Sequence, residues 1–103
     1  MAQYRQGDVF LEQVEVLPDG AVDVAPENGR LVLAHGEATG HAHTLAMSDG
    51  AYYAKGAERF LRIVREEAFL RHEEHAPIGV PPGLYRVRRQ REYTPEEIRT
   101  VLD

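Results

Sequence analysis

Turn-forming residues interrupt this chain so often that long helices and long strands are disfavoured over most of its length. Clusters of glycine, proline and small polar residues recur at 18–20, 26–29, 48–50, 55–56, 77–79 and 81–83. The segments between them are short and rich in Val, Leu, Tyr and Phe. Short apolar runs separated by turn residues are typical of antiparallel β-domains. We therefore predict an all-β fold, a small barrel or sandwich of six to eight short strands.

The apolar runs indicate where these strands lie. Strands are expected over approximately residues 8–16, 30–35, 42–47, 51–54, 59–65, 68–72 and 84–90. The turn sequence Ser48-Asp49-Gly50 predicts that the strands on either side of it form a hairpin. Glu66-Glu67 predicts a second tight turn, between the strands at 59–65 and 68–72.

The last residues carry a different pattern, which predicts a short C-terminal helix. Thr94 is a favourable N-cap, Pro95 suits the first helical position, and Glu97 completes a capping box. Ile98, Val101 and Leu102 then recur at the spacing of one apolar helical stripe. We expect this helix to pack on the sheet or on another subunit.

The length and composition favour one cytoplasmic domain that spans residues 1–103. A chain of 103 residues is of ordinary domain size. It has no cysteine, which excludes disulfides and thiolate zinc sites and fits a reducing compartment. No run approaches the roughly 18 apolar residues that a membrane span needs. We therefore expect no membrane partner.

Charge is unevenly distributed along the chain, although the net charge is −5. Eight of the twelve basic residues are arginines between positions 59 and 91. Arginine suits ion pairs at interfaces and bidentate contacts with carboxylates or phosphates. We expect the basic strands to pair with acidic segments of the same chain or of a second copy, which predicts a homo-oligomer. The acidic overall balance argues against nucleic acid as the partner.

All five histidines lie in two clusters, which makes a metal site the leading hypothesis. His35, His41 and His43 fall within nine residues, and His72 and His75 flank Glu73-Glu74. Residues two apart on a strand share a face, so His41 and His43 would project together. Imidazole binds zinc, iron, manganese and nickel, and the residues do not distinguish among these divalent ions.

The predicted ligands are His41 and His43, with His35, Glu37 and one of His72 or His75 as additions. If the protein is an enzyme, Glu37 or Glu74 would act as the catalytic base beside an open metal position. Two alternatives stay open at this point. The histidines could form a pH-sensitive or anion-binding pocket, or they could be structural residues of loops.

The pair His41-Ala42-His43, followed by a later histidine segment in a chain of short strands, resembles the cupins. In that family an HxH pair, a glutamate a few residues on and a later histidine bind one metal inside a jelly-roll barrel. The resemblance implies that His41, His43 and one of His72 or His75 bind metal. The family's glutamate would fall near Met47 or Ser48, so Glu37 would have to supply the acid.

A second resemblance covers most of the chain. The segments at 35–43, 72–75 and 85–93 are similar to those of small uncharacterised bacterial and phage proteins, for which no activity is implied. This similarity leaves a second function open, a non-enzymatic assembly or adaptor protein that forms homo-oligomers.

Overall fold

The computed structural model describes residues 2–36 and 40–90, and this part of the chain is built from β-strands. Its elements, in chain order, are β1 (Gln3–Gln6), β2 (Val9–Gln13), β3 (Val22–Asp23), β4 (Arg30–His35), β5 (Ala42–Ala46), the 3-10 helix η1 (Met47–Asp49), β6 (Gly50–Lys55), β7 (Glu58–Ile63), β8 (Ala68–Leu70), β9 (Ile78–Val80) and β10 (Gly83–Arg89). The prediction of an all-β fold is confirmed.

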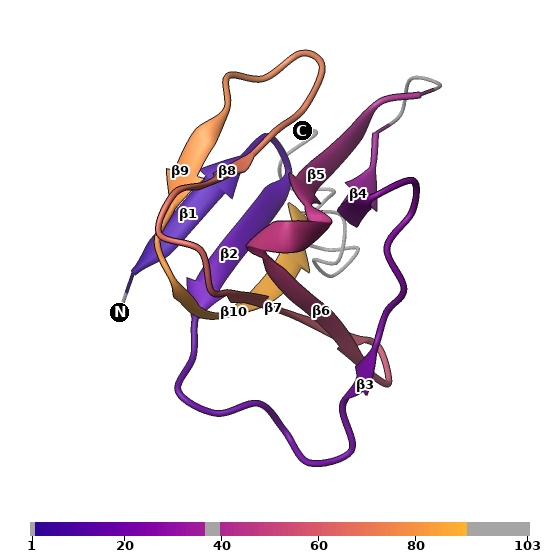
Figure 1. Cartoon of the computed structure of the whole chain (residues 1–103), viewed down its shortest axis with the longest axis vertical. Helices are drawn as coiled ribbons and strands as arrows, with labels where there is room; N and C mark the ends of the chain where they lie inside the picture. Colours follow the sequence, from indigo (N-terminus) through magenta and orange to yellow (C-terminus); the bar gives the residue numbers. More distant parts are fainter. Residues whose placement is uncertain (1, 37–39, 91–103) are drawn as a thin grey trace, which may run out of the picture.

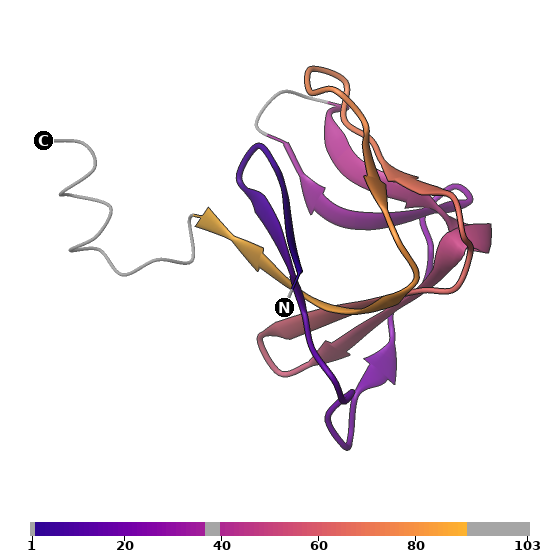
Figure 2. The same ribbon diagram turned by 90° about the vertical axis from the view of Figure 1, so that its left-hand side faces the viewer.

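The strands form two layers (Figures 1 and 2). One layer is a six-stranded antiparallel sheet in the order β1-β2-β10-β7-β6-β3. The other consists of the hairpin β4–β5 and the pair β8–β9. A β-bridge joins these two pairs, because Thr44 and Arg71 exchange backbone hydrogen bonds of 2.9 Å. The large sheet does not close on itself, so the fold is sandwich-like rather than a barrel.

The hydrophobic core lies between the layers, because alternate residues of each strand point inward. Burying these apolar side chains is the main favourable term in the stability of such a domain. The large sheet contributes Val9, Leu11, Tyr52, Leu61, Ile63, Tyr85 and Val87, and the second layer contributes Leu31, Leu33, Leu45, Ala68, Leu70 and Val80.

One prediction of strand pairing is wrong. The strands on either side of the Ser48-Asp49-Gly50 turn do not form a hairpin, since β5 pairs with β4 while β6 pairs with β3 and β7. The connection is the 3-10 helix η1, which carries the chain from one layer to the other. The carbonyl of buried Asp49 accepts backbone hydrogen bonds from Val64 (2.9 Å) and Arg65 (3.3 Å). These bonds hold the crossover against the end of β7.

The described residues form ten strands where six to eight were expected. The short strands β1, β3 and β9 were not predicted, and Asp8, the expected start of a strand, lies in the two-residue turn of the β1–β2 hairpin. Gly7 supplies the positive φ (58°) that such a turn favours. The turn predicted at Glu66-Glu67 connects β7 to β8, but these strands do not pair with each other.

The C-terminal helix predicted from Thr94 onward lies outside the described residues. Within residues 2–36 and 40–90, no helix has the length and apolar character needed to cross a membrane.

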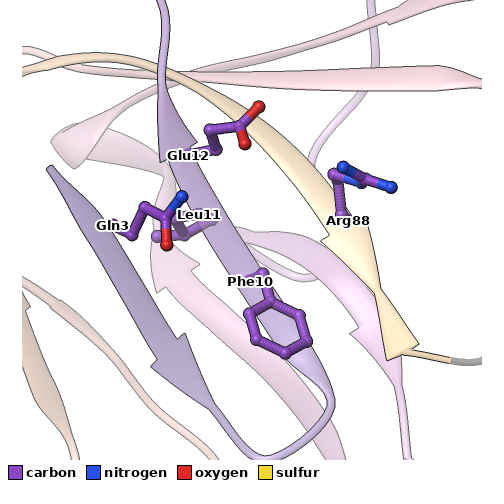
Figure 3. A pocket seen from close by; sticks show the side chains of 5 residues that line it. All are labelled: Gln3, Phe10, Leu11, Glu12 and Arg88. Carbon is purple, nitrogen blue, oxygen red and sulfur yellow. The ribbon is translucent and has the colours of Figure 1, made fainter. Parts of the chain in front are cut away.

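The outer face of the large sheet carries polar and charged side chains. Gln3, Phe10, Glu12 and Arg88 project from the same side of β1, β2 and β10, around a hollow of about 170 Å³ (Figure 3). Arg88 lies opposite Phe10 in the strand register, and Arg86 lies opposite Glu12. This surface is separated from the histidines by the sheet and its core, and we refer to it as the outer arginine face.

Candidate metal centre

At one end of the sandwich the apolar core gives way to polar side chains. His43 follows the same inward alternation as Leu45 on β5, and both are buried. Gln6 and Arg89 both lie opposite Val9 in the register, so they also point inward. Buried polar groups are costly unless they are hydrogen-bonded, so the polar groups at this end of the core need partners within the protein. Among the described residues, the buried Arg89 Nε has no such partner.

Gln6 fixes the orientation of the His43 ring. The Gln6 Nε2 amide donates hydrogen bonds to the carbonyls of Leu70 (2.8 Å) and Ala76 (3.0 Å). The other amide atom, Oε1, lies 2.9 Å from His43 Nδ1 and can only accept. His43 Nδ1 therefore carries a proton, and in the neutral ring the free electron pair is on Nε2.

That electron pair faces a carboxylate. His43 Nε2 lies 3.4 Å from Asp8 Oδ1, and Arg89 Nη2 donates to Asp8 Oδ2 at 3.2 Å. Burial, together with the charge of His72, lowers the pKa of His43 to about 4. Burial opposes ionisation of Asp8, but the charge and hydrogen bond of Arg89, together with the charge of His43 and a backbone hydrogen bond, lower the pKa of Asp8. Near neutral pH two electron-rich atoms therefore oppose each other, an arrangement that a cation would stabilise.

The connection between β8 and β9 brings the second histidine cluster to the first. The ring centroid of His72 lies 4.4 Å from that of His43, 4.7 Å from that of His75 and 5.6 Å from that of His41. The His75 ring is also stacked on His43 at 5.8 Å. Figures 1 and 2 show this connection beside the β1–β2 turn and the start of β5, at the upper end of both views. Four imidazoles from distant segments thus meet at one place.

Two of these imidazoles and one carboxylate can converge on one ion. His41, His72 and Glu73 each offer a ligand atom, and these atoms lie within 4.8 Å of one another. His41 Nδ1 lies 3.1 Å from Glu74 Oε1, which leaves its Nε2 for a ligand. Glu73 Oε1 accepts a hydrogen bond from the Ala42 amide (2.9 Å), and that bond lowers the pKa of the Glu73 carboxyl.

The residues that build this geometry lie within a stretch of the chain that matches a known family. A family model described as "Domain of unknown function (DUF8820)" matches residues 5–90. The chain belongs to this family. The prediction of an uncharacterised family is thereby confirmed, and the four clustered histidines all lie within the matched range of the DUF8820 domain. No curated protein and no solved structure matches the chain.

Two glycines of this DUF8820 domain allow the clustered histidines to approach the backbone closely. A Cβ atom at Gly7 would lie 2.7 Å from His75 Nε2 and 3.3 Å from His43 Cε1. A Cβ atom at Gly36 would lie 3.1 Å from His72 Nε2 and 3.0 Å from His41 Cβ. The 2.7 Å distance at Gly7 is shorter than the contacts that Cβ atoms make in proteins, so any other residue at this position would displace the His75 imidazole.

The predicted ligands do not all join the cluster. The His35 imidazole is exposed and lies 3.7 Å from Glu27, and only its backbone carbonyl reaches the site, through Arg89 Nη2 at 3.2 Å. Glu37, proposed from the sequence as a base or ligand, lies outside the described residues. Glu74, proposed as a base, lies against His41 Nδ1.

Sequence reasoning missed Gln6, Asp8 and Arg89, and it did not name Glu73 as a metal ligand. One signal could have found Gln6 and Asp8. The sequence Gln6-Gly7-Asp8-Val9 has the glycine of a two-residue hairpin turn, which would have placed Gln6 beside Val9 on the inward face. The contacts of Arg89 and Glu73 depend on strand pairing that has no local signal in the sequence.

Proposed function

We propose that this domain binds a divalent transition metal through His41, His72 and Glu73. The observation that carries the proposal is the convergence of two imidazoles and one carboxylate within 4.8 Å. Two histidines and one carboxylate form a set that leaves positions open on the ion for water or a substrate.

The surroundings of the ligands support the proposal. The Glu74 carboxylate lies 3.1 Å from His41 Nδ1, and a carboxylate in this place commonly orients a metal-binding imidazole and raises its basicity. His72 Nδ1 now accepts a hydrogen bond from the Glu74 amide at 3.0 Å. Binding through His72 Nε2 places a proton on Nδ1 and therefore breaks that bond, so the 72–75 segment adjusts when the ion is bound.

The opposition between His43 Nε2 and Asp8 Oδ1 is a second supporting observation. An ion at the neighbouring His72 would place positive charge beside both acceptor atoms. His43, fixed by Gln6, then supplies either a further ligand or a buried acceptor next to the ion. His75, stacked on His43, is the remaining imidazole of the site.

The proposal modifies the ligand set that the cupin resemblance implied. His41 and a later histidine are retained, but Glu73 provides the carboxylate and His43 moves to the edge of the set. Zinc, iron, manganese and nickel all accept such ligands. A bound ion would act as a Lewis acid on water or on a substrate oxygen at its open position.

Metal content tests the proposal. We expect near-stoichiometric metal by inductively coupled plasma mass spectrometry in untagged protein purified without nickel resin or chelator. His41→Ala should lose the metal, while His35→Ala should retain it, because His35 lies outside the cluster. Wild-type protein that contains no metal and takes up no zinc, iron, manganese or nickel would contradict the proposal.

Self-association of the domain is also a proposal, supported by the outer arginine face and by the exposed side chains of Val22 and Phe69. Light scattering after size-exclusion chromatography, at low and at high salt, tests it. A monomer under both conditions would overturn it.

A further inference from the structure

A hollow of about 350 Å³ opens directly beside the proposed ligands. Two of the proposed ligands, His72 and Glu73, line this hollow. The rest of its lining is Arg30, Ala42, Thr44, Arg71 and Pro77. The hollow is therefore lined both by candidate metal ligands and by arginines.

The backbone fixes how the two arginines reach this hollow. Arg71 immediately follows β8 and is tied to Thr44 by the bridge between the two hairpins. Arg30 begins β4 and pairs with Ala46 of the adjacent strand β5. Both positions belong to the second layer, where the β4–β5 ladder holds Arg30 and the bridge to Thr44 holds Arg71.

In the part of the chain that the structure describes, neither arginine has an acidic partner that would explain its position. Among residues 2–36 and 40–90, the guanidinium groups of Arg30 and Arg71 form no ion pair and no hydrogen bond, although Arg71 lies over the Phe69 ring at 5.6 Å. By contrast, Arg65 pairs with Asp49, and Arg89 pairs with Asp8. The Glu73 Oε1 atom is already engaged by the Ala42 amide.

We propose that this hollow binds a small oxyanion, a carboxylate or a phosphate, through Arg30 and Arg71. Guanidinium groups bind both anions through paired, charge-assisted hydrogen bonds. The Thr44 hydroxyl adds a neutral donor in the same lining. This inference rests on the proposed metal function, because it names the class of ligand that would reach an open position on the ion. The two arginines would bind the negative charge of that ligand.

Binding of two simple probes tests this inference. Dissociation constants for phenyl phosphate and for benzoate are measured by ligand-observed NMR, on zinc-loaded and on metal-free protein. The two probes distinguish phosphate from carboxylate as the preferred anion. The same samples are analysed for zinc, so that loss of the metal is recognised separately from loss of the anion.

We expect saturable binding of at least one probe to the zinc-loaded protein. Arg71→Gln should weaken it about tenfold, the scale of one charge-assisted hydrogen bond in a partly exposed site. Arg30→Gln should act in the same direction, with zinc content unchanged in both variants. The matched control is Arg88→Gln, because Arg88 lies on the outer arginine face, and it should bind as the wild type does.

Two results would overturn the inference. One is the absence of saturable binding in both the zinc-loaded and the metal-free protein. The other is wild-type affinity in both Arg30→Gln and Arg71→Gln. If the protein takes up no zinc, iron, manganese or nickel, the metal proposal fails, and the titration of metal-free protein then decides: binding that requires the two arginines supports the oxyanion site.

Discussion

The histidine end of the core and the outer arginine face use similar residues in opposite ways. On the outer face, Glu12, Arg86 and Arg88 point away from the core because of the alternation within β2 and β10. At the histidine end, Gln6, His43 and Arg89 follow the inward alternation and are held by contacts between distant segments. One surface keeps its charges in solvent, and the other gathers polar groups where the core ends. This difference is why we propose the histidine end, rather than the charged face, as the functional site.

The largest effect should follow from removing a proposed ligand. We expect His72→Ala to weaken zinc binding by a factor of about a hundred or more, because it removes one of three ligands. The substitution also alters the segment that places Glu73 beside His41. Competition titration with a chromophoric chelator measures the affinity. Arg86→Ala on the outer arginine face should leave it unchanged, and equal losses in the two variants would abolish the distinction between the regions.

Removing the side chain that fixes His43 should be the next largest effect. Gln6→Leu leaves His43 Nδ1 and the carbonyls of Leu70 and Ala76 without their buried partner. We expect the free energy of unfolding to fall by about 2–4 kcal/mol, because unsatisfied buried groups retain their desolvation penalty. Urea unfolding measures it.

The matched control for that substitution is Gln3→Leu. Gln3 lies on the same strand, but it is exposed and lines the outer hollow (Figure 3). We expect a change within about 0.5 kcal/mol there. A similar loss at both positions would show that β1 tolerates no leucine, and that the Gln6 contacts are not the cause.

These contrasts also show what the sequence could predict. Alternation and turn residues correctly gave the all-β class, and they placed the strand at 30–35 with the bounds that β4 has. Pairing was harder, because the turn at 48–50 carries the same residues whether it closes a hairpin or crosses between layers. The 3-10 helix η1 and the buried Asp49 decide the outcome, and Asp49 is held by hydrogen bonds from the two residues that follow β7.

The site was predictable only in part, for the same physical reason. Clustering in the sequence indicated His41, His43, His72 and His75, all of which the structure brings together. It also indicated His35, which lies at the end of β4 with its side chain turned toward Glu27. The turn at Gly7-Asp8 could have placed Gln6 on the inward face, but it could not have identified the three partners of Gln6, which lie 37, 64 and 70 residues away.

Acid should destabilise the metal-free protein through His43. The pKa of this histidine is lowered from 6.5 to about 4 in the folded protein, so the unfolded chain binds the extra proton between these two values. Stability is therefore expected to rise with pH across this window and to be lost on acidification from pH 6.5 to pH 4, by up to about 3 kcal/mol. Urea unfolding at several pH values between 4 and 7 measures this slope.

A His43→Gln variant is the control, because it removes the titrating ring and keeps a polar side chain. Its stability should depend less steeply on pH than that of the wild type over the same window. Parallel slopes would show that other groups cause the acid sensitivity.

The smallest effect is expected on the outer arginine face. Arg88→Gln should change the free energy of unfolding by no more than about 0.5 kcal/mol, since Arg88 is partly exposed and its nearest charged neighbours are on the solvent side of the sheet. Thermal unfolding measures the shift. A loss above 2 kcal/mol would show that this face is held by specific contacts, as the histidine end is.

The most direct measurement is a crystal structure of zinc-loaded protein with anomalous diffraction at the zinc edge. The account predicts one strong anomalous peak bounded by His41, His72 and Glu73, at ligand distances of about 2.0–2.2 Å, with His35 remote from it. Two results would contradict the claim that these distant segments build one metal site. One is a peak that involves only one of the two histidine clusters, and the other is the absence of an ordered zinc ion in crystals of protein that contains one zinc per chain.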